Sequence, residues 1–454
     1  MKRKICAALA MMLAWHAPSF GQNYLETLTK RLEPDVEHLR GLTFQRDIEK
    51  TVQNAGELRA VLDRELARAY PGDALRHLEQ RLLKFGFVVS PVDLRQMYLQ
   101  LFSQQIAGYY DPITQKMVLV TNEGGGGAQG TPLMMQLFSN WIVRQFGLTM
   151  DEILLAHELT HVLQDQHFRL MSLPLEDARQ EDMGSAAKAL VEGDAMLVMV
   201  DYMLHAQAPG VDATQAPDIS ANMRNWSNHP LVRAMSVSPS FPRYLTDNLF
   251  FSYIDGFDFV LHLKKQGGWN AVNQAYAHPP ASTEQILHPE KYQDQPDAPT
   301  ILQLPDFSAE LPGWDLIETN TLGEFNIRLL LDGFLSSADA VQASAGWGGD
   351  RFALYEERQS GQLLLAWVTA WDSKRDAKEF FRLYGKMLEK RYAPEAPHGK
   401  SADAPPNPRF WQTDAGTVWL ERKGNCVLFL DGAAETLAPS FRQKLWNETI
   451  ITHR

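Results

Sequence analysis

The segment HELTHVLQDQHF, at residues 157–168, restricts what this chain can fold into more than any other stretch of its sequence. Its two histidines, His157 and His161, are four positions apart, and side chains at that spacing project from one face of a helix, one turn apart. Both imidazoles can therefore bind a single metal ion. Glu158 lies about 100° round the helix from His157, near enough to reach a water on that metal without binding the metal itself.

A catalytic zinc ion is held by three protein ligands and a water, so the motif requires a third ligand elsewhere. We expect it to be Glu192 in ALVEGDA, because thirty residues after His161 suffice for the helix to end and a second helix to pack back across it. Gly193 would let the two helices approach closely. Asp194 is the rival ligand, but it lies about 200° round the helix from Glu192, so both cannot face one metal on a regular helix. Glu192 is preferred because it shares a helix face with the small residue Ala195.

The alternative is an ordinary polar helix that contains the pattern by chance. A chain with 13 histidines should contain HExxH in roughly two cases in a hundred. This segment, however, follows Thr149 and Glu152, which form a capping box and start a helix. We therefore interpret the site as a metal centre, and its imidazole ligands suit zinc. His167 points away from the face of His161 and is expected to be structural.

The amino-terminal residues have the layout of a secretory signal peptide. Basic residues at 2–4 precede an apolar run over 5–15, and the small residues Ser19 and Gly21 surround a cleavage point. The apolar run is shorter than the roughly 20 residues that an ordinary membrane span needs. We expect residues 1–21 to be a signal peptide and the mature protein to be exported, periplasmic or secreted, with no later transmembrane span. The alternative is a chain tethered to the inner membrane by an uncleaved signal.

The composition limits the class of protein. The 454 residues are too many for one compact core and suit two or three domains. The formal net charge of -12 argues against nucleic-acid binding, which normally requires a basic stripe. Cys6 would leave with the signal peptide, so Cys426 would be alone and no intrachain disulfide could form. Cys426 lies in the apolar stretch NCVLFL, where a buried inert thiol is expected.

The periodicity of apolar residues predicts an α+β protein with two domains. Residues 22–298 read as mostly helical with a small sheet, whose hairpin is YYDPITQKMVLVT. Residues 299–454 read as a small α+β unit of strand pairs and helices. The stretch NEGGGGAQG at 122–130 is expected to be a flexible surface loop, with an active-site lid as the alternative. A helix near residue 260 is expected to break at Gly267-Gly268, and the residues 347–350 are expected to form a turn between helix and strand.

The HExxH helix followed by a glutamate-bearing helix resembles the gluzincin group of zinc metallopeptidases, which includes thermolysin-like enzymes. The segments AGYYDP, HELTHVLQDQHF, ALVEGDA, PPASTEQILHPEKY and GWGGDRF more closely resemble a poorly characterised subgroup of bacterial and archaeal metallopeptidases. This match spans roughly residues 90–390. The resemblance implies a zincin-like catalytic domain, with one zinc ion per chain bound by His157, His161 and Glu192 and with Glu158 as the base.

The chain departs from thermolysin-like enzymes at one position. Those enzymes place an aspartate four residues after the ligand glutamate, where it orients a ligand histidine, but this chain has Met196 there. Asp165, one turn past His161, would support the ligands instead. Alternatively, Asp165 is only a solvated helix residue.

The implied chemistry is hydrolysis of an amide, in which zinc activates a water and polarises the scissile carbonyl. Glu158 would take the proton of the water and pass it to the leaving amine. The oxyanion needs a further donor, for which the candidates are Tyr110, or its neighbour Tyr109, and His288. The alternatives are a packed aromatic pair and a histidine that caps a turn. By analogy with zincins, the strand at 116–121 would be the edge along which a peptide substrate lies.

The leading hypothesis is an exported zinc-dependent endopeptidase or aminopeptidase that acts on peptides or proteins, with the carboxy-terminal unit as an accessory domain. A second hypothesis is a non-catalytic zincin-fold scaffold or chaperone-like binding protein of the cell envelope. The presence of Glu158 argues against it, because a purely structural metal site does not need that base. A third hypothesis is hydrolysis of another substrate, such as peptidoglycan cross-links, although the acidic chain does not favour binding to anionic wall polymers.

Overall fold

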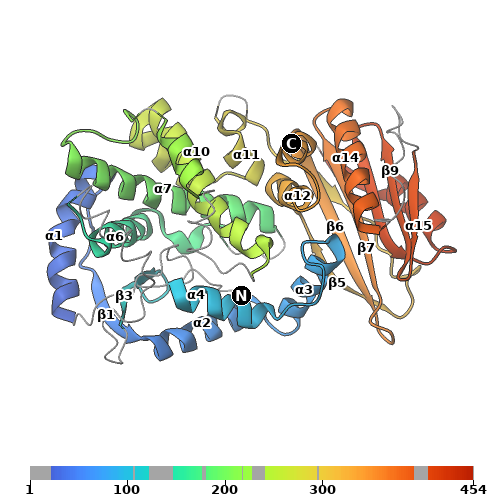
Figure 1. Ribbon diagram of the computed structural model, residues 1–454, viewed down its shortest axis with the longest axis horizontal. Coiled ribbons are helices and arrows are strands. Elements are labelled where there is room, and N and C mark those ends of the chain that lie inside the picture. The colour runs from blue at the N-terminus through green and yellow to red at the C-terminus, as the bar shows by residue number, and fades with distance from the viewer. Residues whose placement is uncertain are drawn as a thin grey trace. The chain divides into compact units, whose positions relative to one another are not determined.

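The computed structural model describes residues 22–105, 108–121, 147–175, 180–216, 218–227, 241–293, 296–392 and 407–452. The chain is a mixed α+β protein, as predicted, and it forms two compact units (Figure 1). The first unit comprises Met1–Leu75, Asp93–Glu176 and Gly184–Pro280, and the second comprises Arg76–Val92, Asp177–Met183 and Ala281–Arg454. The predicted signal peptide and the glycine-rich stretch 122–130 lie outside the described residues.

The first unit is mostly helical. Its helices are α1 (Gln22–Arg40), α2 (Ala55–Ala69), α4 (Leu94–Gln105), α6 (Met150–Phe168), α7 (Glu181–Gln207, from Gly184 onward), α8 (Ile219–Ser227) and α10 (Arg243–Ala277). Helix α10 has non-helical backbone angles at Gly267 and Gly268, where the break is predicted. A turn of 3-10 helix at Leu170–Ser172 follows α6.

The first unit also contains a three-stranded sheet of β1 (Glu49–Asn54), β2 (Gly108–Asp111) and β3 (Lys116–Thr121), in the order β1-β3-β2. Strands β2 and β3 form the predicted antiparallel hairpin. The prediction that β3 is an edge was wrong, because β1 pairs with it in parallel on the other side. Strand β1 has the polar sequence EKTVQN and no clear apolar alternation, so the sequence gives little sign of a strand there.

Helix α6 is buried on nearly all sides. Thr149 accepts a hydrogen bond from the backbone N–H of Glu152, and Glu152 accepts one from the backbone of Thr149, so the helix begins with the predicted capping box. The helix buries residues on every face, among them seven polar ones: Glu152, His157, Glu158, Thr160, His161, Gln164 and Asp165. Because burial of an unpaired polar group is costly, these side chains must find partners inside the unit.

The second unit is built on a six-stranded antiparallel sheet in the order β5-β6-β7-β10-β9-β8. Its strands are β5 (Trp314–Asn320), β6 (Trp347–Glu357), β7 (Leu363–Trp371), β8 (Arg409–Thr413), β9 (Gly416–Lys423) and β10 (Cys426–Ala433). Strand β4 (Ile301–Gln303) pairs with β11 (Ile450–Thr452) in a separate two-stranded sheet. Residues 347–350 belong to β6 and not to a turn, because β6 continues through a bulge between Trp347 and Gly349.

Helices cover both faces of this sheet. One core joins the sheet to α12 (Gly323–Asp332), α13 (Ser337–Ser344) and α14 (Lys374–Tyr392), and buries Trp347, Trp367 and Trp371. The other core joins it to α15 (Ala438–Glu448), as in Figure 1. The unit also holds most of α3 (Ala74–Phe85), α11 (Thr283–Leu287) and the short turn Pro289–Lys291. Cys426 is buried with a free thiol, as predicted.

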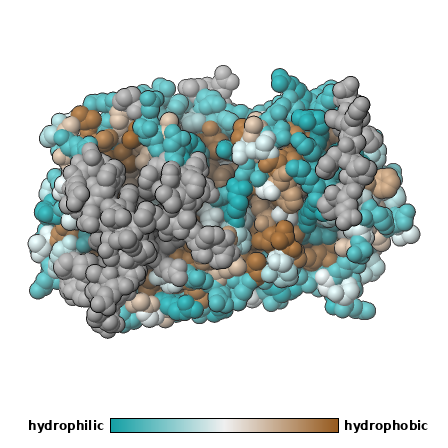
Figure 2. All heavy atoms as spheres, in the orientation of Figure 1, coloured by the Kyte–Doolittle hydropathy of each residue, from teal (hydrophilic) through white to brown (hydrophobic). Residues whose placement is uncertain are grey.

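The exposed hydrophobic residues of the described structure are scattered over its surface. Among the described residues, no helix is both long and apolar enough to span a bilayer. On the face drawn in Figure 2, hydrophilic and hydrophobic residues alternate in small groups over the coloured surface. The most exposed large hydrophobic residues include Val89, Phe410 and Ile450, and single exposed residues of this kind are ordinary in proteins.

Candidate metal centre

Helices α6 and α7 bring the three predicted ligands together inside the first unit. The Nε2 atoms of His157 and His161 lie 3.1 Å apart. Glu192 Oε2 lies 3.3 Å from Nε2 of His157 and 3.6 Å from Nε2 of His161. All three residues are buried, and their ligand atoms lie within 4.8 Å of one another. The three donors therefore converge on one point, although they come from two helices.

The spacing and the chemistry of these donors fit a small divalent cation. In a tetrahedral zinc site with bonds of about 2.0–2.1 Å, neighbouring ligand atoms are about 3.3 Å apart, close to the three separations found here. Neither carboxylate oxygen of Glu192 has a hydrogen bond of regular geometry within the described part of the chain. A buried carboxylate without such partners is costly unless a cation balances it. Two imidazoles and one carboxylate are a donor set that zinc accepts.

The electrostatics of His157 and Glu192 favour the forms that bind a metal, whereas the metal-free His161 favours its protonated form. Burial lowers the pKa of His157, which favours the neutral imidazole that a metal ligand must be. Burial raises the pKa of Glu192, but the nearby His161 and His157 outweigh it and lower the pKa, so this carboxylate is ionised. Burial lowers the pKa of His161, yet the Glu192 carboxylate raises it to about 9. A cation beside Glu192 would replace the proton that His161 otherwise holds there.

Glu158 lies beside the three ligands and is not one of them. Its Oε2 accepts a hydrogen bond of 2.9 Å from the backbone N–H of Tyr110 on β2. Burial raises the pKa of Glu158 to about 7, with a further contribution from Glu192. Glu158 and His161 keep small exposed fractions of 6% and 7%, whereas His157 and Glu192 have none. Glu158 is therefore not fully enclosed, unlike His157 and Glu192.

The side chain of Tyr110 is engaged elsewhere. Its hydroxyl donates a 2.8 Å hydrogen bond to Oδ2 of Asp165, and the neighbouring Tyr109 hydroxyl contacts Gln53. Asp165 is buried and also accepts a hydrogen bond from the backbone N–H of Leu170. Asp165 is thus not a solvated helix residue, and among the described residues its hydrogen bonds come from Tyr110 and Leu170 and not from a ligand histidine. The pair formed by Tyr110 and Asp165 instead ties β2 to α6 and so positions the N–H that holds Glu158.

Support for His161 comes from residues that the sequence analysis did not assign to this role. Its Nδ1 lies 2.8 Å from Oε1 of Gln164, one turn along α6. Gln164 in turn contacts Asp194, the rival ligand, at 3.1 Å. Asp194 is paired with Arg40 and accepts a hydrogen bond from Tyr276. These three partners engage its carboxylate, and Asp194 is not among the residues whose ligand atoms converge, as the angle of about 200° between it and Glu192 on the helix predicts.

Gly193 allows a close helix contact, but not the expected one. A Cβ atom at Gly193 would lie 2.1 Å from the carbonyl oxygen of Gly256 on α10. A Cβ at Gly256 would lie 2.2 Å from the carbonyl oxygen of Ala189 on α7. The close approach is therefore between α7 and α10, and not between α7 and the HExxH helix. It fixes the turn of α7 that carries Glu192.

Two other histidines from the sequence analysis lie elsewhere. His167 contacts the carbonyl oxygen of Thr43 at 2.8 Å, as expected of a structural residue. His288, proposed as an oxyanion donor, belongs to the second unit. There its Nε2 lies 3.1 Å from Oε1 of Glu324, which raises the pKa of His288. A catalytic role for His288 stays a prediction.

A second cluster of carboxylates surrounds a lysine. Glu284, Asp297 and Asp372 of the second unit place carboxylate oxygens within 4.8 Å of one another. The ammonium group of Lys291 lies 2.6, 3.0 and 2.7 Å from them, respectively. The lysine therefore supplies the positive charge that a metal ion would otherwise supply.

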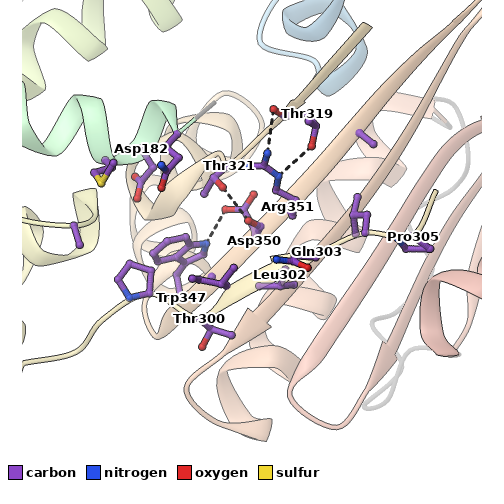
Figure 3. A pocket seen from close by; sticks show the side chains of 18 of the residues that line it. Asp182, Thr300, Leu302, Gln303, Pro305, Thr319, Thr321, Trp347, Asp350 and Arg351 are labelled. Atoms are coloured by element: carbon purple, nitrogen blue, oxygen red, sulfur yellow. Dashed lines mark hydrogen bonds between the residues drawn. The ribbon is translucent and has the colours of Figure 1, made fainter. Parts of the chain in front are cut away.

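The second unit also contains a cavity of about 700 Å³ beside β4, β5 and β6 (Figure 3). Among its lining residues, Arg351 donates hydrogen bonds to the hydroxyl and the carbonyl oxygen of Thr319. Asp350 in GWGGDRF is buried and accepts hydrogen bonds from two backbone N–H groups and from the indoles of Trp347 and Trp367. The charged groups of this motif therefore hold the fold of the unit together, which explains the motif without a ligand.

Comparison with known proteins adds little to this geometry. Residues 313–440 match a family that is described as a domain of unknown function, DUF8575. No curated protein matches the chain. Among solved structures, the chain is similar to a candidate hydrolase with a novel fold from Chloroflexus aurantiacus. That similarity has 14% sequence identity and a TM-score of 0.32, and it covers 62% of this chain and 93% of the other. A similarity this weak supports no conclusion about fold or activity, so the site has to be interpreted from its own residues.

Proposed function

We propose that the protein is a zinc-dependent metallopeptidase that binds one zinc ion per chain through His157, His161 and Glu192. The observation that carries the proposal is the buried Glu192 carboxylate. It has no hydrogen bond of regular geometry from any described residue, and its Oε2 lies 3.3 and 3.6 Å from two imidazole nitrogens. The presence of Glu158 at the edge of this centre favours a catalytic site over a structural one. The predicted substrate is a peptide or protein, and the predicted location is outside the cytoplasm.

The ligands would hold the ion, and Glu158 would handle the protons. A zinc ion held by these ligands would lower the pKa of a bound water and would polarise the scissile carbonyl. The backbone N–H of Tyr110 holds Oε2 of Glu158, so Oε1 is the atom that would take the proton of the attacking water. Glu158 would then give that proton to the leaving amine nitrogen, which completes the hydrolysis. Because the Tyr110 hydroxyl donates to Asp165, we assign Tyr110 to positioning Glu158 and not to stabilising the oxyanion.

The isosteric variant Glu158→Gln tests the catalytic part of this proposal. Without a base, hydrolysis of denatured casein and of a mixed peptide library should fall by about 10²–10⁴-fold. The zinc content of the variant should stay at the level of the wild type, since Glu158 is not a ligand. The control is Gln166→Met. Gln166 lies on the same helix, about two turns after Glu158, and this variant should retain activity. A zinc-loaded wild type that cleaves none of these probes would favour the non-catalytic scaffold. A fully active Glu158→Gln variant would instead contradict the assignment of Glu158 as the base.

A further inference from the structure

We infer that Gln164 and Asp194 form a positioning chain that forces His161 to present Nε2, and not Nδ1, as the metal-binding atom. The inference rests on the proposed metal centre and deepens it. Neither residue touches the ion in this scheme: Gln164 acts through His161, and Asp194 acts through Gln164.

The orientation of the Gln164 amide follows from its neighbours. Its Nε2 lies 3.0 Å from the carbonyl oxygen of Val191 and 3.1 Å from Oδ2 of Asp194. Both neighbours only accept hydrogen bonds, and an amide NH₂ group has two hydrogens to donate. With the amide reversed, its carbonyl oxygen would face a carbonyl oxygen and a carboxylate with no hydrogen between them. The amide nitrogen must therefore face α7, and Oε1 must face His161.

The orientation of Gln164 decides the tautomer of His161. Oε1 of Gln164 lies 2.8 Å from Nδ1 of His161. An amide oxygen cannot donate, so Nδ1 must carry the hydrogen. The neutral imidazole then has its lone pair on Nε2, the atom that lies 3.1 Å from Nε2 of His157 and 3.6 Å from Oε2 of Glu192. When a cation replaces the Nε2 proton, Nδ1 therefore keeps its hydrogen on Gln164 and Nε2 is the nitrogen that is left to bind.

The far end of the chain is anchored by a buried ion pair. Nε of Arg40 lies 2.8 Å from Oδ1 and 3.1 Å from Oδ2 of Asp194, and both side chains are fully buried. The Tyr276 hydroxyl donates to Oδ2 of Asp194 at 2.7 Å. The guanidinium lies 4.3 Å from the ring of Trp269, which follows the break in α10. Helices α1, α6, α7 and α10 therefore all contribute to the position of one ligand.

The test compares zinc affinity in Gln164→Met, which keeps the length of the side chain but cannot hydrogen-bond in this way, with the wild type and with the control Gln166→Met. Competition against a chromophoric chelator should show zinc binding about 10–100-fold weaker in Gln164→Met and unchanged in Gln166→Met. The visible spectrum of the cobalt(II) protein should shift in Gln164→Met only, because it reports the ligands of the ion. Equal affinity and an unchanged cobalt spectrum in Gln164→Met would overturn the positioning chain while leaving the metal centre in place.

Two further measurements cover the case in which Gln164→Met does not fold. Tyr276→Phe removes one donor to Asp194 and keeps the ring, and it should weaken zinc binding in the same direction. Nitrogen-15 spectra of the zinc-loaded wild type should show His161 with its hydrogen on Nδ1. A hydrogen on Nε2, or undiminished affinity in Tyr276→Phe, would contradict the inference. A wild type that binds no zinc would overturn the metal centre and this inference together.

Discussion

At the scale of single residues, the first unit depends on charges that are buried in pairs. Arg40 and Asp194 have no exposed side-chain surface. Replacement of one partner leaves the other charge buried without compensation, which is far more costly than the loss of an exposed ion pair. The same residues support His161 through Gln164, so their effects on stability and on metal binding are linked.

Asp194→Ala should therefore destabilise the first unit by about 3–5 kcal/mol. Urea unfolding of the metal-free protein measures this free energy without a contribution from zinc. Asp63→Ala, which breaks the exposed pair with Arg95, is the control and should cost about 0–1 kcal/mol. Equal, small losses in the two variants would show that the buried pair does not anchor α1 to α7.

The ligand residues could be predicted from sequence because their spacing is local. His157, Glu158 and His161 lie on one helix, and Glu192 follows after a length of chain that suits a returning helix. Gln164 escaped prediction because a glutamine in a polar run looks like a surface residue. Its position three residues after His161 is a signal only once its contacts with α7 are known.

At the scale of elements, the position of Glu192 depends on how closely α7 packs against α10. Gly193 and Gly256 meet where a Cβ at either would overlap backbone atoms of the other helix. No rotation of a side chain can relieve such an overlap, so the helices themselves would have to separate. The turn of α7 that would move is the one that carries the third ligand.

Gly193→Ala should destabilise the first unit by roughly 1–3 kcal/mol or more, the range found for overpacked cores, and should weaken zinc binding. Gly56→Ala is the control. Gly56 lies in the first turn of α2, where the nearest side-chain atom would be 3.3 Å from the new Cβ. This variant should leave the stability and the zinc affinity near those of the wild type. Thermal unfolding with and without zinc measures both effects. Unchanged zinc affinity in Gly193→Ala would show that α7 does not depend on this contact to place Glu192.

Some elements can be predicted from the sequence and others cannot. The capped helix α6, the hairpin of β2 and β3 and the break at Gly268 follow from strong local signals. The parallel pairing of β1 with β3 joins segments far apart in sequence, and the polar sequence of β1 gives no sign of it. For that reason the prediction from sequence places β3 at an edge of the sheet, where it does not lie. The edge strand next to Glu158 is β2, whose Tyr110 N–H contacts this carboxylate.

At the scale of the whole molecule, the division into units differs from the contiguous boundary at 298/299. The second unit includes Arg76–Val92 and Asp177–Met183 as well as Ala281–Arg454. Sequence composition indicates a linker, and all residues before that linker are then assigned to one domain. Composition cannot reveal that two short early segments pack with the carboxy-terminal part, because that packing depends on tertiary contacts.

One of these segments supplies a carboxyl group that makes the second unit sensitive to pH. Burial raises the pKa of Asp182 to about 8, against the hydrogen bonds that Thr283 donates to it. An aspartate in the unfolded chain ionises near pH 4, so the folded state holds the proton more tightly. The stability that this proton supplies is fully present below about pH 4 and is lost as the pH rises through about 8.

Asp182→Asn should remove this dependence, since the amide oxygen can still accept from Thr283 and carries no charge. The free energy of unfolding of the variant minus that of the wild type should rise between about pH 5 and pH 8 and level off above about pH 9. Urea unfolding followed by fluorescence of the buried tryptophans Trp347, Trp367 and Trp371 reports on the second unit. A difference that is constant over this range of pH would show that Asp182 is ionised in the folded protein.

The central claim is that His157, His161 and Glu192 bind one zinc ion, and the metal content of the purified protein tests it most directly. We predict about one zinc per chain by mass spectrometry in the wild type, and a loss or strong weakening of binding in both His161→Ala and Glu192→Ala. The variants His278→Ala and Glu290→Ala change the same residue types outside the centre and should retain the ion. A wild type without zinc after zinc loading would contradict the account, and full retention of zinc by Glu192→Ala would contradict the assignment of the third ligand.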